Sequence, residues 1–240
     1  MADAFARAGH RVEIFIPGWR KSVKSSQFKG KYSVKGDFKI HYLPYVSLRG
    51  KCKAASFSAI VFMKSLVWDR QTFIITRNER VAYLLTLQAR KVIYENHTFY
   101  YSSGATTLKY RSRVARLMRN KNVHMITISH RLKELWANYG IDKSKISVIH
   151  DGVTIEDYRN LQNLSKDDVR TKLNLPYGKR IVCYTGTLRI ERGIDFILEA
   201  SKLYKDYIFV LVGGSQREID ATKSHFNPSS NVIFTGYVDN

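Results

Sequence analysis

The chain has 240 residues, of which 40 are Lys or Arg and 20 are Asp or Glu, so its formal net charge is +20. With 44% hydrophobic and 25% charged residues, the composition is that of a globular protein and excludes a disordered or collagen-like chain. The two cysteines lie far apart and beside no histidine cluster, which argues against a disulfide scaffold or a structural zinc site and predicts a cytoplasmic protein.

The positive charge is confined to the first part of the chain. Residues 1–150 hold 28 basic and 8 acidic side chains, whereas residues 151–240 hold 12 of each. Such an imbalance indicates that the first part faces a polyanion, either a nucleic acid or an anionic membrane surface. A bias that serves only solubility, without any partner, is the alternative.

Short runs typical of strands alternate with helical patterns along the chain. The strand runs are residues 12–16, 39–43, 72–76, 91–95, 125–129, 145–149, 180–185, 208–212 and 231–235. The helical patterns are residues 54–68, 79–88, 108–119, 130–139, 194–203 and 218–224. Several strand runs are apolar on both faces, as strands covered by helices on each side are. The order predicts an α/β protein with parallel, doubly wound sheets.

A polar stretch divides the chain near Asp151. We expect an N-terminal domain at residues 1–150 and a C-terminal domain at residues 151–240, with a short helix between Ser165 and Pro176 near the start of the second. A stop signal at Gly9 directly before the first strand run indicates that a helix ends there and that the strand before it is missing. The last strand run leaves an open sheet edge. These features predict a fragment of a longer protein, with an incomplete C-terminal domain.

Glycine turns follow all three strand runs of the second part. The turns and their neighbours are Gly186, Thr187, Arg189, Arg192, Gly213, Gly214, Gly236, Tyr237 and Val238. At the carboxyl edge of a parallel sheet, backbone amides and a helix N-terminus bind phosphate, and guanidinium groups neutralise a diphosphate. We therefore expect a phosphate-bearing ligand there. The alternative is that the glycines merely end the strands and that the arginines are solvated.

The order of the segments resembles glycosyltransferase family 4. SVIHDGVTIEDY, YTGTLRIERGIDFILEAS, VLVGGS and NVIFTGYV are similar to the nucleotide-sugar domain of that family. FARAGHRVEIFIP, VIYENHTF and ITISHRLKELWANYGI resemble its acceptor-side domain. The resemblance covers nearly the whole chain. It implies the GT-B fold of two Rossmann-like domains, and retaining transfer of a hexosyl group from a nucleoside diphosphate sugar without a metal or other cofactor.

The resemblance also implies which residues bind the donor. Arg192 stands where a lysine before glycine usually binds the diphosphate, and residues 236–238 match the turn whose backbone contacts the base. Thr187 stands where an arginine commonly binds the same phosphates, so that contact looks weakened, and Arg189 is a candidate replacement.

His97 is the catalytic residue that the resemblance implies, because it matches a histidine that reaches the transferred sugar. Without the resemblance, a lone histidine after a strand is more often a packing residue. Asp151 departs from the usual asparagine between the domains. The family's pair of donor-binding glutamates lies beyond the point where this sequence stops, so we expect no measurable transfer from this chain alone.

The basic first part suggests where such an enzyme works. Enzymes of this type often act on lipid-linked or membrane-bound acceptors in polysaccharide biosynthesis, and the charge would hold the protein as a peripheral membrane protein on the anionic inner face. Residues 54–68 either dip into that interface through their aromatic side chains or form a buried core helix.

Two other functions stay open from the sequence. The charge, with 15 Tyr and 12 Phe, would suit a nucleic-acid-binding module. Against it, the glycine turns lie in the neutral part and no nucleic-acid-binding motif is present, so we expect no nucleic acid as partner. The departures at Thr187 and Asp151 also allow a degenerate, non-catalytic fragment.

Overall fold

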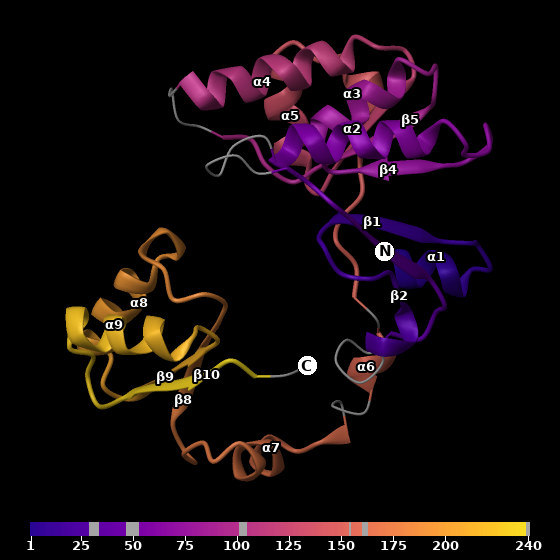
Figure 1. The fold of residues 1–240 in the computed structure, drawn as a ribbon. Helices are drawn as coiled ribbons and strands as arrows, with labels where there is room; N and C mark the ends of the chain where they lie inside the picture. The colour runs from indigo at the N-terminus through magenta and orange to yellow at the C-terminus, as the bar shows by residue number, and fades with distance from the viewer. Residues whose placement is uncertain (29–33, 47–52, 101–104, 154, 160–162, 239–240) are drawn as a thin grey trace. The chain divides into compact units, whose positions relative to one another are not determined.

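A computed structural model describes the chain apart from residues 29–33, 47–52, 101–104, 154, 160–162 and 239–240. The chain divides into two compact units, Met1–Val153 and Thr154–Asn240, and each combines helices with mostly parallel strands (Figure 1). Three residues separate the end of the first unit from the domain boundary that the sequence suggests. The fold is therefore the α/β class that the alternation of strand runs and helical patterns predicts.

The first unit contains two sheets. The larger has the order β4-β5-β6-β7 with all strands parallel, and these strands are Ile74–Thr76, Val92–Asn96, Val123–Thr127 and Ile146–Val148. In the smaller sheet, β1 (Glu13–Pro17) runs parallel to β3 (Lys39–Leu43), and β2 (Val23–Lys24) is antiparallel to β3. The sequence missed β2 because two residues are too few to show a pattern. The order of strand runs did not reveal the division into two sheets, because pairing between strands is a tertiary property.

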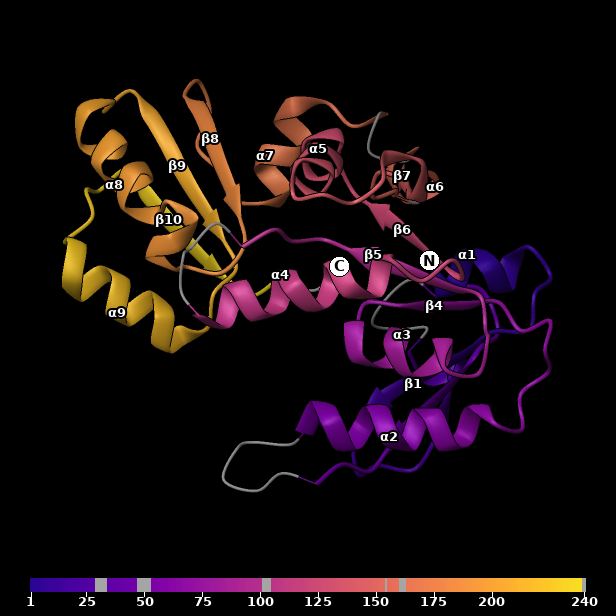
Figure 2. The ribbon, with the colours of Figure 1, turned by 90° about the horizontal axis from the view of Figure 1, so that it is seen from above.

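Three helices, α3 (Glu79–Thr86), α4 (Ala105–Met118) and α5 (His130–Asn138), pack on the larger sheet. The unit also contains α1 (Ala2–Arg7), α2 (Lys53–Ser65), which contacts β3 and α3, and short 3-10 turns at Ser25–Phe28 and Lys143–Lys145. Figure 2 shows α2, α3 and α4 lying next to one another in that order. Two of these helices have side-chain N-caps. The side chain of Asn78 accepts from the backbone N–H groups of Arg80 and Val81 at the start of α3, and Ser129 caps α5.

The helix α2 is a core helix on one side. Phe57 and Val61 are buried, and the ring of Trp68, just beyond the helix, lies 5.2 Å from that of Phe15. The apolar side chains that face solvent are Met63, Leu66 and Val67. Of the two alternatives for residues 54–68, the buried core helix agrees with the inward packing of Phe57 and Trp68, whereas contact of this segment with a membrane stays a prediction. Among the helices in the described ranges, none is long and apolar enough to cross a bilayer.

The second unit has one parallel sheet with the order β10-β9-β8. These strands are β8 (Arg180–Thr185), β9 (Tyr207–Val212) and β10 (Val232–Gly236), and α8 (Ile194–Leu203) and α9 (Gln216–Phe226) follow β8 and β9. Leu198 and Leu211 are fully buried between the helices and the sheet. Before β8 come α6 (Glu156–Arg159) and α7 (Lys166–Lys172), and Ser165 caps α7 as its sequence predicts.

Candidate functional site

Three loops meet at the carboxyl edge of the second unit's sheet. The backbone N–H of Gly186, after β8, donates to the carbonyl of Val212 at 2.9 Å, and that of Gly213 donates to the carbonyl of Gly236 at 2.7 Å. A Cβ on Gly213 would lie 2.4 Å from the carbonyl oxygen of Gly186, and its φ of +111° also disfavours a side chain. Glycine is therefore required at position 213 for the first two loops to approach this closely.

The two arginines expected to bind phosphate lie in different surroundings. Arg192 ends a 3-10 turn (Ile190–Arg192), and Gly193, in the left-handed region at φ +77°, leads into α8. Arg192 is exposed, and within the described residues no acidic side chain pairs with it. The Nε atom of Arg189 lies 4.0 Å from Oε1 of Glu218. Arg192 therefore keeps its guanidinium available for a ligand, whereas Arg189 already faces a carboxylate.

The other expected donor-binding residues surround the same edge. The hydroxyl of Tyr184 donates to the carbonyl of Thr187 at 2.8 Å, which fixes the loop after β8. A Cβ on Gly214 would meet the buried side chain of Leu188 at 2.8 Å, so this turn also packs closely. Tyr237 and Val238 follow β10 and are exposed. The structure brings all nine residues to the ends of three neighbouring strands, and their binding role stays a prediction.

His97 lies at the carboxyl edge of the first unit's larger sheet. It follows β5, and its Nε2 atom lies 2.8 Å from Oε1 of Glu95. Arg77, directly after β4, donates to both oxygens of the same carboxylate, from Nε to Oε2 at 3.0 Å and from Nη2 to Oε1 at 2.9 Å. Glu95 is 7% exposed, whereas the side chain of His97 is 25% exposed. The buried carboxylate therefore orients the imidazole and leaves its Nδ1 side for other partners.

Charge around Glu95 sets the ionisation of this group. Burial would raise the pKa of Glu95, but hydrogen bonds from Arg77 and His97 outweigh burial, so its pKa lies below the usual range. The pKa of Arg77 is raised, mainly by its hydrogen bonds to Glu95 and also by the charge of Asp151. Asp151, where the family commonly has asparagine, thus adds negative charge beside Arg77. Glu95 is therefore a carboxylate and Arg77 a guanidinium cation at neutral pH.

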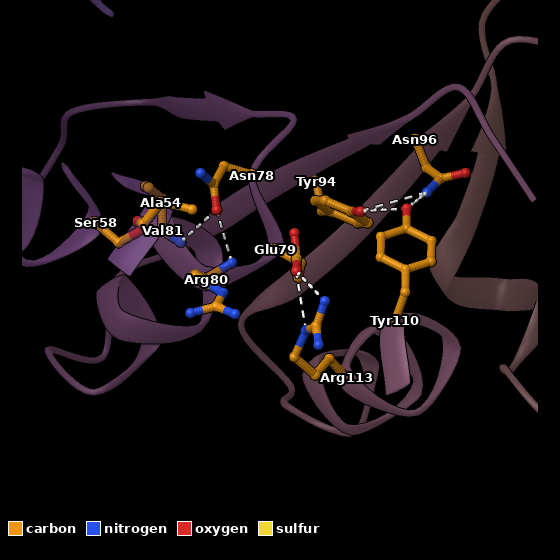
Figure 3. Close-up of polar contacts among 10 residues, drawn as sticks. All are labelled: Ala54, Ser58, Asn78, Glu79, Arg80, Val81, Tyr94, Asn96, Tyr110 and Arg113. Carbon is orange, nitrogen blue, oxygen red and sulfur yellow. Dashed lines mark hydrogen bonds and ion pairs between the residues drawn. The ribbon is translucent and has the colours of Figure 1, made fainter. Parts of the chain in front are cut away.

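A buried polar network supports the end of β5. Asn96 is 2% exposed, and its Oδ1 accepts from Nε1 of Trp136 at 2.9 Å while its Nδ2 donates to the hydroxyl of Tyr110 at 2.9 Å. The hydroxyl groups of Tyr94 and Tyr110 lie 3.0 Å apart (Figure 3). Because Asn96 lies between Glu95 and His97, these bonds hold the backbone that carries both side chains. They give the candidate site a rigid base.

The sequence did not indicate that Glu95 contacts His97 or that Arg77 contacts Glu95. The signal was available for Arg77, since a charged residue directly after a strand run lies at the carboxyl edge of a parallel sheet. Glu95 looked like an ordinary strand residue, and only the strand pairing shows that it faces Arg77. No three His, Cys, Asp or Glu side chains gather as a metal site within the described ranges.

The sequence model of Glycosyltransferase Family 4 matches residues 1–157. The chain belongs to this family. A curated relative, an uncharacterised 41.2 kDa protein in the cps region of Klebsiella pneumoniae, is 24% identical over 167 residues, which cover 65% of this chain and 43% of that protein.

Solved structures of glycosyltransferases resemble the chain over 99% of its length. Sucrose-phosphate synthase from Thermosynechococcus elongatus has a TM-score of 0.71 at 18% identity, and HepE from Anabaena, solved with UDP, has 0.68 at 14%. The chain spans 63% and 64% of those two structures. At these identities the likeness shows the fold, which is that of GT-B glycosyltransferases.

Proposed function

We propose that this family member is part of a retaining glycosyltransferase that moves a sugar from a nucleoside diphosphate donor to a lipid-linked or envelope glycan acceptor. The observation that supports the proposal best is the meeting of the three glycine loops at one sheet edge, together with Arg192, which has no acidic partner among the described residues. HepE, which shares the fold, binds UDP and UDP-glucose. A nucleoside diphosphate sugar is therefore the ligand class that we assign to the second unit.

Each part of this edge has a role in the proposed reaction. As the bond to the sugar breaks, negative charge accumulates on the leaving diphosphate, and donors already in place stabilise it. Arg192 and the backbone amides that follow Gly186 are the groups we assign to this task, with Gly213 and Gly214 allowing close approach. The turn from Gly236 to Val238 is assigned to the base.

The role proposed for His97 rests on its partner in the first unit. Glu95 accepts a hydrogen bond from Nε2 and thereby favours the imidazole with its proton on that nitrogen. The Nδ1 atom is then a hydrogen-bond acceptor for a sugar hydroxyl. Glu95 and Arg77 are positioning residues in this scheme, since they act on the sugar only through His97.

The charge of the first unit supports an anionic membrane as the place of action. Its excess of basic residues would bind anionic lipid with about 1 kcal/mol per residue near the surface, an attraction that salt weakens. Co-sedimentation with vesicles tests this part of the proposal. Binding to anionic vesicles that falls as salt rises is expected, and equal binding to neutral vesicles would contradict it.

Titration of the chain with UDP by calorimetry tests the donor site without requiring transfer. We expect binding that weakens about tenfold in Arg192→Ala, because a charge-assisted contact to the diphosphate is lost. Lys205→Ala, which removes an exposed charge between α8 and β9 at the opposite edge of the same sheet, is the matched control and should bind as the unchanged chain does. Equal affinities of the two variants would remove Arg192 from the site, and no UDP binding by the unchanged chain would refute the proposed function.

A further inference from the structure

A second cavity lies on the helices of the first unit. It measures about 320 Å³ and opens between α2, α3 and α4. Residues from all three helices line it, among them Ala55 from α2, Leu84 from α3 and Arg116 from α4. This volume is at the lower end of the range for small-molecule pockets, which fits a short ligand segment and not a whole nucleotide sugar.

The charged groups of this cavity are unbalanced. Three guanidinium groups, those of Arg80, Arg113 and Arg116, meet a single carboxylate, that of Glu79. Arg113 forms an ion pair with this carboxylate, since its Nε and Nη2 atoms lie 3.0 and 2.9 Å from Oε1 of Glu79. Within the described residues, no acidic group lies within 4.0 Å of the guanidinium of Arg80 or Arg116. Two positive charges in the cavity lining therefore lack an acidic partner in the part of the chain that the structure describes.

Figure 3 shows two of the three guanidinium groups, those of Arg80 and Arg113. Arg80 from α3 and Arg113 from α4 extend on either side of Glu79. Two first-turn amides of α3 are not available to a ligand, because Oδ1 of Asn78 accepts from the N–H groups of Arg80 and Val81 at 3.0 and 3.3 Å. The guanidinium groups of the side chains are therefore the main groups that could bind an anion.

The remaining wall of the cavity is apolar. Ala55, Tyr83 and Leu84 contribute carbon surface. The hydroxyl of the buried Ser58, another lining residue, donates to the carbonyl of Ala54 at 2.6 Å and is satisfied (Figure 3). The lining therefore combines two guanidinium groups that lack an acidic partner among the described residues with apolar contact surface. That combination matches a ligand with an anionic group attached to a hydrocarbon chain.

We propose that this cavity binds a phosphorylated amphiphile, with the phosphate held by Arg80 and Arg116 and the first part of the alkyl chain against Leu84 and Tyr83. Guanidinium groups bind phosphate oxygens in pairs, and two of them match the two charges of a phosphate monoester. The inference rests on the proposed function for its biological role, which is to hold the phosphate of a lipid-linked acceptor. Binding itself is independent of the donor site.

The test compares three probes by NMR titration of the complete chain, with the backbone amides of both units followed. Octyl phosphate below its critical micelle concentration is expected to bind and to shift amides around Ala55, Tyr83 and Leu84. Octyl glucoside, which has the same chain and a neutral head group, and inorganic phosphate, which has no chain, should each bind at least about tenfold more weakly. Equal binding of octyl glucoside, or equal binding of free phosphate, would overturn the proposal.

Variants with equal charge loss locate the binding. The double variant Arg80→Gln/Arg116→Gln should weaken octyl phosphate about tenfold or more, whereas Arg119→Gln/Arg131→Gln removes two exposed arginines outside the cavity and should not. All four side chains are exposed, so both variants are expected to fold. Similar affinities of the two variants would overturn the assignment. UDP, titrated into the same samples and followed through amides of the second unit, separates this inference from the proposed function, because either ligand can bind when the other fails.

Discussion

Arg90 offers the sharpest test of how the first unit is held together. It is 6% exposed, and its guanidinium closes the carboxyl end of α2 by donating to three carbonyl groups. Nη2 donates to the carbonyls of Ser65 and Trp68 at 2.7 Å each, and Nη1 donates to that of Asp69 at 2.8 Å. A longer bond, at 3.2 Å, runs from Nε to the side-chain oxygen of Gln88. The positive charge also lies at the negative end of the helix dipole. Replacing Arg90 with methionine keeps most of the apolar stem and removes every donor.

The size of the effect follows from these contacts. Each hydrogen bond from a charged donor contributes about 1.5–3 kcal/mol, so three would suggest more than 4 kcal/mol. Two effects reduce this value. The carbonyls of Ser65 and Asp69 each keep one bond, from the N–H groups of Trp68 and Thr72. The methionine variant also avoids the desolvation cost of burying the guanidinium group. We therefore expect Arg90→Met to lower the free energy of unfolding by about 3 kcal/mol, a shift in Tm of about 6–12 °C.

Tryptophan fluorescence during urea denaturation measures the loss of unfolding free energy in the first unit. All three tryptophans, Trp19, Trp68 and Trp136, belong to the first unit, so their emission reports on that unit alone. Lys91→Met is the matched control, since it removes an exposed charge at the next position. Arg90→Lys should fall between the two, because lysine keeps the charge and loses the fork of donors. A loss in Arg90→Met no larger than in Lys91→Met would refute the reasoning.

Two further predictions concern the candidate site. Gly213→Ala should lower the unfolding free energy of the second unit by more than about 2 kcal/mol and weaken UDP binding, because the new Cβ meets the carbonyl oxygen of Gly186. The control Gly178→Ala, at φ +72° in open space, should cost only about 1 kcal/mol. Equal losses of the two variants in urea denaturation, followed by circular dichroism, would contradict the close approach. The lowered pKa of Glu95 means that its ion pairs stabilise the folded first unit fully above the unfolded pKa of about 4.3, and that this contribution is lost as the pH falls through the lower folded pKa. Glu95→Gln should therefore flatten the dependence of unfolding free energy on pH between about 2 and 5, and an unchanged slope would show that the Arg77 and His97 contacts do not stabilise the ionised form.

The sequence by itself determined the longer elements and the class of fold. Residues 39–43, 180–185 and 194–203 form two strands and a helix with the predicted bounds, because their apolar patterns agree with the face that each element buries. The family resemblance followed from the same order of segments, and the match over residues 1–157 confirms it. The glycine turns were visible too, since Gly186, Gly213 and Gly236 each follow a strand run.

Only the tertiary structure decided which residues meet. Pairing of β4 with β5 brings Arg77 against Glu95 across 18 positions of sequence, and Glu95 in turn fixes His97. Packing of α3 against α4 places Arg113 beside Glu79 and leaves Arg80 and Arg116 without an acidic partner in the described part of the chain. Local patterns encode which face an element buries, whereas the partner of a charged side chain depends on strand order and helix packing. That is why the sequence indicated the glycine loops but not the carboxylate behind His97 or the basic cavity.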